Sequence, residues 1–223
     1  MDGNGRWAQR RGMPRTAGHS AGSESFRRAA YYLKDLGVKY LTVYAFSTEN
    51  WKRPPEEVSA IMSLLRKYLL ESIEEMCRKN IRLRFLGDLA PLDGELKRLI
   101  ERTDELSRQN DGMLVSVCLN YGGRAEIIRA AQALGRRCAD GELRPEDVTE
   151  EALAAELYSA GAPDPDLVIR PGGEKRISNF LLWQSSYSEF YFTDTLWPDM
   201  DERELDKAIA EYQRRNRRFG GVK

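Results

Sequence analysis

The sequence is poor in the residues from which metal centres and disulfide frameworks are usually built. Among 223 residues it has a single histidine, His19, and three widely spaced cysteines that form no Cys-x-x-Cys pair. One histidine argues against a histidine-rich zinc site, and an odd number of scattered cysteines argues against a disulfide framework. The opening residues do not resemble a signal peptide. These features predict free thiols in a reducing, cytoplasmic compartment.

Long apolar runs and a net charge are also missing. No apolar run approaches the ~20 residues needed to span a bilayer. The formal net charge is zero, which gives no support for a nucleic acid as partner. The charge is unevenly spread, however, because residues 1–53 hold ten Lys and Arg against four Asp and Glu. A basic first quarter in a neutral protein favours a local anion site.

Several nucleotide-binding and hydrolase motifs are absent as well. There is no G-x-x-x-x-G-K-[ST], which disfavours a P-loop NTPase, and no G-x-G-x-x-G after an expected strand. A Ser-His-Asp hydrolase would need His19 as its base. The G-x-S-x-G match at residues 18–22, GHSAG, contains that histidine itself and follows no expected strand, so it does not supply a nucleophile elbow. A diphosphate-binding phosphatase stays a weaker alternative, because it would need a nucleophile that the sequence does not offer.

The most informative stretch is the first 22 residues. Asp2 precedes Gly3-Asn4-Gly5, and four arginines and His19 follow. Glycines let a backbone approach a ligand, and arginine presents donors that match phosphate. A carboxylate beside them is a typical ligand of a magnesium ion that a diphosphate also binds. We interpret this stretch as a magnesium-assisted diphosphate site. The alternative is a solvated basic turn, because the same residue types form ordinary turns.

A second group of the same kind lies between Arg170 and Ser178. It has two glycines, two arginines and a serine, and it follows a short expected strand. Two separate groups of arginine and glycine in one domain suggest two anionic groups rather than one.

Hydrophobic periodicity predicts alternating strands and helices. The expected strands are 40–46, 81–86, 113–119, 167–169 and 189–192, and the first of them is apolar enough to be buried on both faces. The expected helices are 23–36, 56–79, 93–109, 124–137, 151–158, 179–184 and 202–218. This alternation predicts a single α/β domain with a mainly parallel central sheet flanked by helices.

The helix expected at 56–79 has an unusually long apolar stripe. Its members follow helical spacing: Val58, Ile61, Met62, Leu65, Tyr68, Leu69, Ile73 and Met76. Core packing is the more ordinary explanation for such a stripe. A face this long and this broad could also line an apolar tunnel.

Six ordered blocks resemble the cis-prenyltransferase family. They are MDGNGRWA, GHSAG around His19, YAFSTENWKRP, NYGGR, IRPGGEKRISNFLLWQSSYSEFYF and the terminal RRFGG. They extend over nearly the whole chain, so residues 1–223 are expected to form one such domain enclosing an apolar tunnel. The aspartate-rich D-D-x-x-D of the unrelated trans-prenyltransferases is absent.

The resemblance implies an enzyme that joins isopentenyl diphosphate to an allylic diphosphate such as farnesyl diphosphate with cis geometry. It implies Mg2+ as cofactor and a long polyprenyl product, expected to be undecaprenyl diphosphate for a cell-wall lipid carrier. A homodimer with transient contact to a membrane surface for product release is expected. The alternative is a non-catalytic relative that binds a partner or a lipid.

The resemblance also implies roles for individual residues. Asp2 and Glu189 match the family's metal-binding positions, the latter across a dimer interface. The expected catalytic residues are Asp2, Asn4, Ser47 and Asn50. The expected substrate-binding residues are Gly3, Gly5, Arg6, Trp7, Arg15, His19, Ser47, Thr48, Glu49, Trp51, Arg53, Arg170, Arg176 and Ser178. The terminal Arg218-Phe219-Gly220 resembles a tail that reaches a neighbouring subunit. Without the family, Trp51 would be interpreted as a core residue and Glu189 as a surface charge.

Two departures from the family pattern carry expectations of their own. Pro171 stands where the family usually has threonine, and it lacks the N–H of other residues, so weaker binding of the second diphosphate is expected. Family members also have an apolar strand before the Met-Asp-Gly-Asn block, whereas here that block opens the chain. Truncation is the favoured explanation, and restoring such a strand is expected to raise stability and activity.

Overall fold

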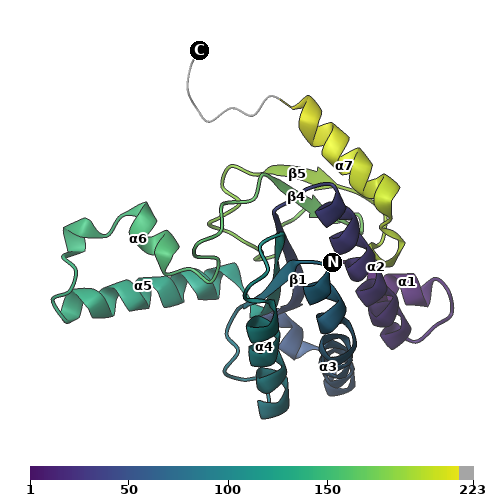
Figure 1. Ribbon diagram of the computed structural model, residues 1–223, viewed down its shortest axis with the longest axis horizontal. Helices are drawn as coiled ribbons and strands as arrows, with labels where there is room; N and C mark the ends of the chain where they lie inside the picture. Colours follow the sequence, from purple (N-terminus) through teal and green to yellow (C-terminus); the bar gives the residue numbers. More distant parts are fainter. Residues whose placement is uncertain (216–223) are drawn as a thin grey trace.

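The strands form two separate parallel sheets. The computed structural model describes residues 1–215, apart from the side chains of Ser72, Ile73 and Cys77. Strands β1 (Tyr40–Ser47), β2 (Ile81–Leu86) and β3 (Met113–Tyr121) form one sheet in the order β1-β3-β2. Strands β4 (Leu167–Arg170) and β5 (Glu189–Phe192) form the other (Figure 1). The predicted α/β class with a mainly parallel sheet is confirmed.

Helices alternate with these strands along the chain. In chain order they are α1 (Asn4–Gln9), α2 (Arg15–Asp35), α3 (Pro55–Arg78), α4 (Gly94–Ser107), α5 (Gly123–Ala139), α6 (Glu150–Ala155) and α7 (Glu202–Arg214). Three short 3-10 turns join them, namely η1 (Thr48–Lys52), η2 (Pro145–Asp147) and η3 (Trp197–Asp199). In Figure 1, α5 and α6 extend to one side of the body that the two sheets and the other helices form.

The middle strand β3 carries the core on both of its faces. Val115 and Val117 pack in the cluster that α2 helps to form, together with Phe26. On the opposite face Cys118 is fully buried and packs in a separate cluster with Leu181. Successive side chains of a strand point to opposite faces, so these contacts place packed layers on both sides of β3.

Strand β1 is less buried than its apolar sequence predicts. Only Val43 and Phe46 of this strand are buried, and Tyr40 is 50% exposed. Within residues 1–215, β1 pairs with β3 on one edge and with no strand on the other. The expectation of a strand buried on both faces is therefore wrong for β1 and applies instead to β3, which has neighbours on both edges.

The sequence also misplaces the start of the second helix. The helix expected at 23–36 begins earlier, because α2 starts at Arg15 after an extended Pro14, and Ser23 lies inside it. The stretch before Ser23 looks loop-like because it contains Gly18 and Gly22. Both glycines are in fact helical, and a Cβ at Gly18 would lie 2.0 Å from the backbone oxygen of Asn4 in α1. The absence of side chains at these two positions allows α1 and α2 to pack closely.

The helix expected at 179–184 is not formed. This segment consists of turns, and Ser178, Asn179 and Leu181 all have positive φ values. Non-glycine residues with positive φ do not continue a right-handed helix. Apolar periodicity alone could not distinguish these turns from a short helix.

The stripe on α3 is mostly core. Met62 and Leu69 are buried with Leu96 of α4 and Leu119 of β3, as core packing requires. Within the described part of the chain, no helix is long and apolar enough to cross a membrane. The expected subunit-reaching tail at residues 218–220 lies outside the described residues.

Candidate active site

The expected site residues gather at the carboxyl ends of β1 and β4. Strand β1 leads into η1, and β4 leads into the loop that ends at Arg176. The first residues of the chain lie between them, with the backbone oxygen of Asp2 accepting a hydrogen bond from the Trp197 amide at 2.9 Å. Carboxyl ends of parallel strands are the usual place for ligands in α/β sheets.

A cavity of about 1130 Å³ opens at this position. Most of the expected catalytic and substrate-binding residues line it: Asp2, Gly3, Asn4, Gly5, Arg6, Arg15, His19, Ser47, Glu49, Asn50, Arg53, Arg170, Arg176 and Ser178. The two arginine-rich stretches, more than 150 residues apart in the sequence, therefore face one cavity. This convergence is what the sequence alone could not demonstrate.

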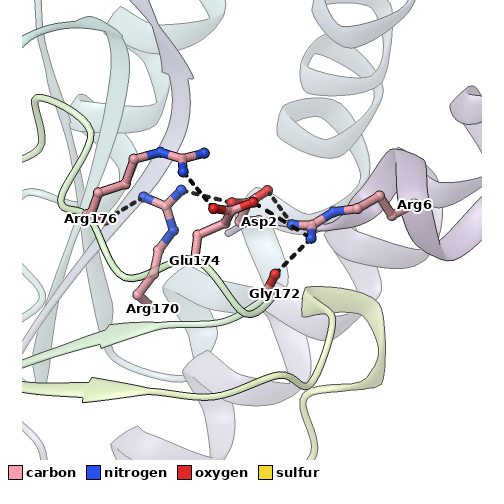
Figure 2. Close-up of polar contacts among 6 residues, drawn as sticks. All are labelled: Asp2, Arg6, Arg170, Gly172, Glu174 and Arg176. Atoms are coloured by element: carbon pink, nitrogen blue, oxygen red, sulfur yellow. Dashed lines mark hydrogen bonds and ion pairs between the residues drawn. The ribbon is translucent and has the colours of Figure 1, made fainter.

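Asp2 is the centre of one charged cluster, which we call the Asp2 cluster and which comprises Asp2, Arg6, Arg170, Glu174 and Arg176. Its carboxylate oxygens lie 2.8 Å from Arg170 Nη2 and 3.4 Å from Arg6 Nη2. Figure 2 shows the arginines approaching from different elements, with both carboxylates between them. Partial burial raises the pKa of Asp2, but the charge and hydrogen bond of Arg170 and the charge of Arg6 outweigh it. Its net pKa is lowered, so Asp2 is ionised at neutral pH.

Glu174 joins the arginines of the same cluster. Its carboxylate lies 2.5 Å from Arg176 Nη1 and 3.8 Å from Arg6 Nη1. Arg6 also donates to the backbone oxygen of Gly172 at 2.7 Å, and a Cβ at Gly172 would lie 2.8 Å from its guanidinium. Gly172 has φ +89, a conformation that favours glycine, and the absence of a Cβ leaves room for the Arg6 guanidinium.

A second cluster is built around Glu57 in the first turn of α3, and we call it the Glu57 cluster. One carboxylate oxygen, Oε1, lies 2.9 Å from Arg53, 3.2 Å from Arg15 and 3.5 Å from His19 Nε2. The three basic side chains line the cavity, whereas Glu57 lies behind them. A Cβ at Gly5 would lie 2.9 Å from the Arg15 guanidinium, so this glycine leaves room for the arginine.

The environment of His19 keeps its imidazole neutral. Burial lowers the pKa of His19, and the charges of Arg53 and Arg15 lower it further. Glu57 acts in the opposite direction through its hydrogen bond and its charge. The net pKa lies below the ordinary value of 6.5, so the imidazole carries one N–H at neutral pH, and its Nε2 lies beside the Glu57 carboxylate.

The polar residues expected to act in chemistry lie beside these clusters. Asn4 lines the cavity, and its side-chain oxygen is buried without a hydrogen-bond partner among the described residues. The Ser47 amide donates to Asn50 Oδ1 at 3.0 Å, which fixes the Asn50 side chain at the start of η1. This oxygen lies against Gly22 of α2, where an added Cβ would come within 2.2 Å of it.

Two asparagines that the sequence analysis did not single out hold η1. Trp51 Nε1 donates to Asn120 Oδ1 at 2.8 Å, and Asn179 Nδ2 donates to Glu49 Oε1 at 2.9 Å. Asn120 lies in the NYGGR block and Asn179 in the block that spans residues 169–192, but no role was predicted for either asparagine. Glu57 and Glu174 were missed in the same way, although the i, i+4 spacing of Arg53 and Glu57 is a readable signal.

Four expected site residues lie outside the cavity lining. Trp7 donates from its indole to Asp199 at 2.6 Å, and Trp51 contacts Asn120 and Phe46. Thr48 lies against Gly122. Glu189 accepts a hydrogen bond from Arg215 at 2.7 Å. Its partner on the neighbouring strand β4 is Leu167, three residues before Arg170. Within one chain the structure therefore does not bring Glu189 together with Asp2.

The Asp2 carboxylate suits a magnesium ion whose remaining ligands come from the substrate phosphates. Within the described residues, no group of three or more His, Cys, Asp or Glu could hold a metal on its own. Magnesium is often bound by only one or two carboxylates together with substrate phosphates. The partly exposed Asp2 carboxylate, which also lines the cavity, fits that arrangement.

The remainder of the cavity is largely apolar. Its apolar lining includes Phe26 and Leu33 of α2, Val43 of β1, Phe190 of β5 and Ile209 of α7. Of the described side chains of the α3 stripe, only Ile61 contributes. The apolar space beside the charged clusters thus lies between α2, β1 and the second sheet, not along α3 as the sequence suggested.

Comparison with known proteins gives full-length matches. A family model described as "Putative undecaprenyl diphosphate synthase" matches residues 1–220. The isoprenyl transferase of Heliobacterium mobile is 50% identical over 223 residues, covering 100% of this chain and 86% of that protein. The isoprenyl transferase of Fusobacterium nucleatum is 51% identical over 223 residues, covering 100% of this chain and 94% of that protein.

Solved structures agree with these matches. The crystal structure of lavandulyl diphosphate synthase from Lavandula x intermedia, in complex with dimethylallyl diphosphate, matches with a TM-score of 0.97 and 36% identity, over 99% of this chain and 95% of that chain. A probable undecaprenyl diphosphate synthase from Campylobacter jejuni matches with a TM-score of 0.79 and 38% identity, over 91% and 93% of the respective chains. By sequence and by structure, this chain belongs to the undecaprenyl diphosphate synthase family of prenyltransferases.

Proposed function

We propose that this protein condenses isopentenyl diphosphate onto an allylic diphosphate such as farnesyl diphosphate, with cis geometry and with Mg2+ as cofactor. The product is a long polyprenyl diphosphate, for which undecaprenyl diphosphate as precursor of a cell-wall lipid carrier is our candidate. The observation that carries the proposal is the meeting of two arginine-rich stretches at one cavity that continues into apolar space. The dimethylallyl diphosphate bound by the lavandulyl diphosphate synthase is itself an allylic diphosphate.

The basic residues of the site divide between the two substrates in this reaction. The allylic diphosphate loses its diphosphate as a carbon–oxygen bond breaks, so positive charge develops on carbon and negative charge on oxygen. Arg6, Arg15 and His19 face the cavity and can bind the leaving diphosphate. Arg170, Arg176 and Ser178 are assigned to isopentenyl diphosphate. Asp2 would hold magnesium, which when bound supplies further charge stabilisation to the leaving group.

The double bond of isopentenyl diphosphate then forms the new carbon–carbon bond, and a proton is lost. A diphosphate oxygen or a polar side chain such as Asn4 receives that proton. Ser47 and Asn50 position the reacting groups at the start of η1, while Trp51 and Arg53 belong to the turn that closes over them. The apolar lining of the cavity receives the growing chain, and contact with a membrane surface releases it.

We further propose that the protein acts as a homodimer. In one chain Glu189 is paired with Arg215 and lies apart from Asp2, so any role of Glu189 in metal binding is assigned to the site of the partner subunit.

The experiment that tests the function is incubation with farnesyl diphosphate, radiolabelled isopentenyl diphosphate and magnesium, followed by chromatography of the extracted lipid. Label in long lipid is expected, and its chain length identifies the product. Asp2→Ala should lower the rate about 10²–10³-fold, and a chelator should abolish it. Arg10→Ala is the matched control, because exposed Arg10 belongs to the same basic stretch but does not line the cavity. Absence of label in a folded protein would contradict the enzyme and favour a non-catalytic relative.

A further inference from the structure

Asn179 occupies a junction between three parts of the molecule. Its backbone oxygen accepts from the Gly123 amide and its Oδ1 from the Arg124 amide, both at 2.8 Å and both at the start of α5. Its Nδ2 donates to Glu49 Oε1 in η1 at 2.9 Å. Three hydrogen bonds that link the start of α5, the turn at Asn179 and η1 therefore converge on one residue.

The backbone at this junction is held in an uncommon conformation. Asn179 has φ +64 and the preceding Ser178 has φ +49, values that cost energy in residues other than glycine. Such conformations persist only where the surroundings fix them, and here α5 does so through its first two amides. These hydrogen bonds tie Asn179 to the start of α5, and a shift of its side chain would act on Glu49.

The neighbouring glycines leave space for this arrangement. A Cβ at Gly122 would lie 2.7 Å from Thr48 Oγ1 and 2.8 Å from Asn179 Nδ2. A Cβ at Gly123 would lie 3.2 Å from the Asn179 oxygen. The paired glycines of the NYGGR block thus permit η1 and the 176–181 segment to meet at the end of β3.

The two partners belong to opposite halves of the site. Glu49 lies in η1 between Ser47 and Arg53, which border one part of the cavity. Asn179 directly follows Ser178, which with Arg176 borders the other part. Their hydrogen bond is a direct link between the two halves.

We propose that Asn179 and Glu49 form a positioning pair that couples the binding of isopentenyl diphosphate beside Ser178 to the conformation of η1. The inference rests on the proposed function, because it assigns the second half of the site to that substrate. When the ligand contacts Ser178, the adjacent Asn179 holds η1, and with it Ser47 and Asn50, in place for reaction. The pair thereby makes arrival of the second substrate a condition for completing the site.

The pair permits a test by exchange of donor and acceptor. In Asn179→Asp, the new carboxylate can still accept from the Arg124 amide, and aspartate tolerates the same backbone conformation. It cannot donate to Glu49, and it places two carboxylates against each other. Burial raises the pKa of Glu49, but its hydrogen bonds with Asn179 and neighbouring groups lower it overall, so Glu49 is ionised. Glu49→Gln retains an acceptor for Asn179, and in the double variant the glutamine amide can donate to the new aspartate.

The first readout is hydrogen–deuterium exchange of residues 48–52 without ligand and with isopentenyl diphosphate. In the parent protein we expect the ligand to slow this exchange. In Asn179→Asp the exchange should be faster without ligand and respond little to it, and the double variant should recover both properties. The melting temperature of each variant shows whether the fold is retained.

The second readout is steady-state kinetics. Asn179→Asp should lower kcat/KM for isopentenyl diphosphate about tenfold, and Glu49→Gln should lower it less. The kcat/KM of the double variant should be higher than that of Asn179→Asp alone. A double variant with only the summed losses, or unchanged exchange at residues 48–52 in Asn179→Asp, would overturn the coupling. Failure of the proposed function appears differently, as a parent protein without turnover, and the ligand-free exchange then still decides whether the pair holds η1.

Discussion

At the scale of single residues, Pro171 lines the cavity between two residues that are held by backbone hydrogen bonds. Thr193 donates its amide to the oxygen of Arg170, and Gly172 donates to the oxygen of Thr195, so the residues on both sides of Pro171 face β5. The backbone of Pro171 therefore faces away from β5, at an edge where a missing N–H breaks no ladder hydrogen bond. Proline is tolerated there, but it offers no donor to a ligand.

Pro171→Thr is expected to lower KM for isopentenyl diphosphate severalfold and to change kcat little. The reason is that Pro171 lines the cavity, where threonine would add an N–H and a hydroxyl near the Asp2 cluster. Steady-state kinetics with varied isopentenyl diphosphate measures the effect. KM for the allylic substrate serves as the internal control, and equal KM values in parent and variant would show that the position does not bind the substrate.

His19 gives a second test at this scale, because it is the only histidine and its NMR signals need no assignment. We expect its titration midpoint below 6.5, since burial and the charges of Arg53 and Arg15 lower the pKa more than Glu57 raises it. A base with a lowered pKa in the folded state contributes stability above pH 6.5 that is lost as the pH falls below this value. Glu57→Gln should move the midpoint lower still. A midpoint at or above 6.5 in the parent protein would contradict this description of the Glu57 cluster.

At the scale of elements, sequence patterns located regular structure well where periodicity and capping agreed. The limits of β2 were predicted to the residue, and α4 begins after Asp93, whose side chain accepts hydrogen bonds from two amides of the first turn. The patterns failed where a glycine or a strained backbone conformation is explained by packing between segments that are distant in the sequence. The start of α2 was hidden by Gly18, which is small because α1 packs on it, and the turns after Ser178 were mistaken for a helix.

The site shows the same division. The arginines, glycines and Asp2 were identifiable because their chemistry matches a diphosphate. The carboxylates that hold them were not identified. The spacing of Arg53 and Glu57 is readable in the sequence, but the contacts of Glu57 with Arg15 and of Glu174 with Arg6 form only when separate segments meet. No periodicity in the sequence indicates that Asn179 would contact Glu49, 130 residues earlier.

A pair of glycine substitutions tests the close packing of α1 on α2. Both Gly18 and Gly135 lie inside helices, where alanine is favoured by roughly 1 kcal/mol. A Cβ at Gly135 would meet nothing within 4 Å, so Gly135→Ala should raise the melting temperature by a few degrees. Gly18→Ala should lower it, because the added carbon would lie 2.0 Å from the Asn4 oxygen. Differential scanning calorimetry measures both, and an equal rise in both variants would contradict close packing at Gly18.

At the scale of the whole molecule, the most unusual feature is the separation of two parallel sheets by the cavity. Every residue of β1 and of β4 lines it, and within residues 1–215 each of these strands is paired along one edge only. The space between the sheets is thus bordered by two strand edges that pair with no further strand among the described residues.

An apolar extended segment supplied ahead of Met1 is expected to pair with these edges and join the two sheets. It should raise the melting temperature, because it would satisfy edge groups and bury apolar lining, and it should raise turnover, because Asp2 would be held more firmly. Calorimetry and the radiolabel assay compare the two chains. A segment of equal length rich in glycine and serine is the control, and equal melting temperature and turnover would argue against the strand.

The position of Cys118 in the middle strand has a kinetic consequence. Its thiol is fully buried, and burial together with the charge of Glu126 raises its pKa. Alkylation requires a solvent-accessible thiolate, so Cys118 reacts only during the moments when the sheet around β3 opens. Cys138 is partly exposed and reacts without such opening. The ratio of the alkylation rates of Cys118 and Cys138 in one sample therefore measures how long the core stays closed.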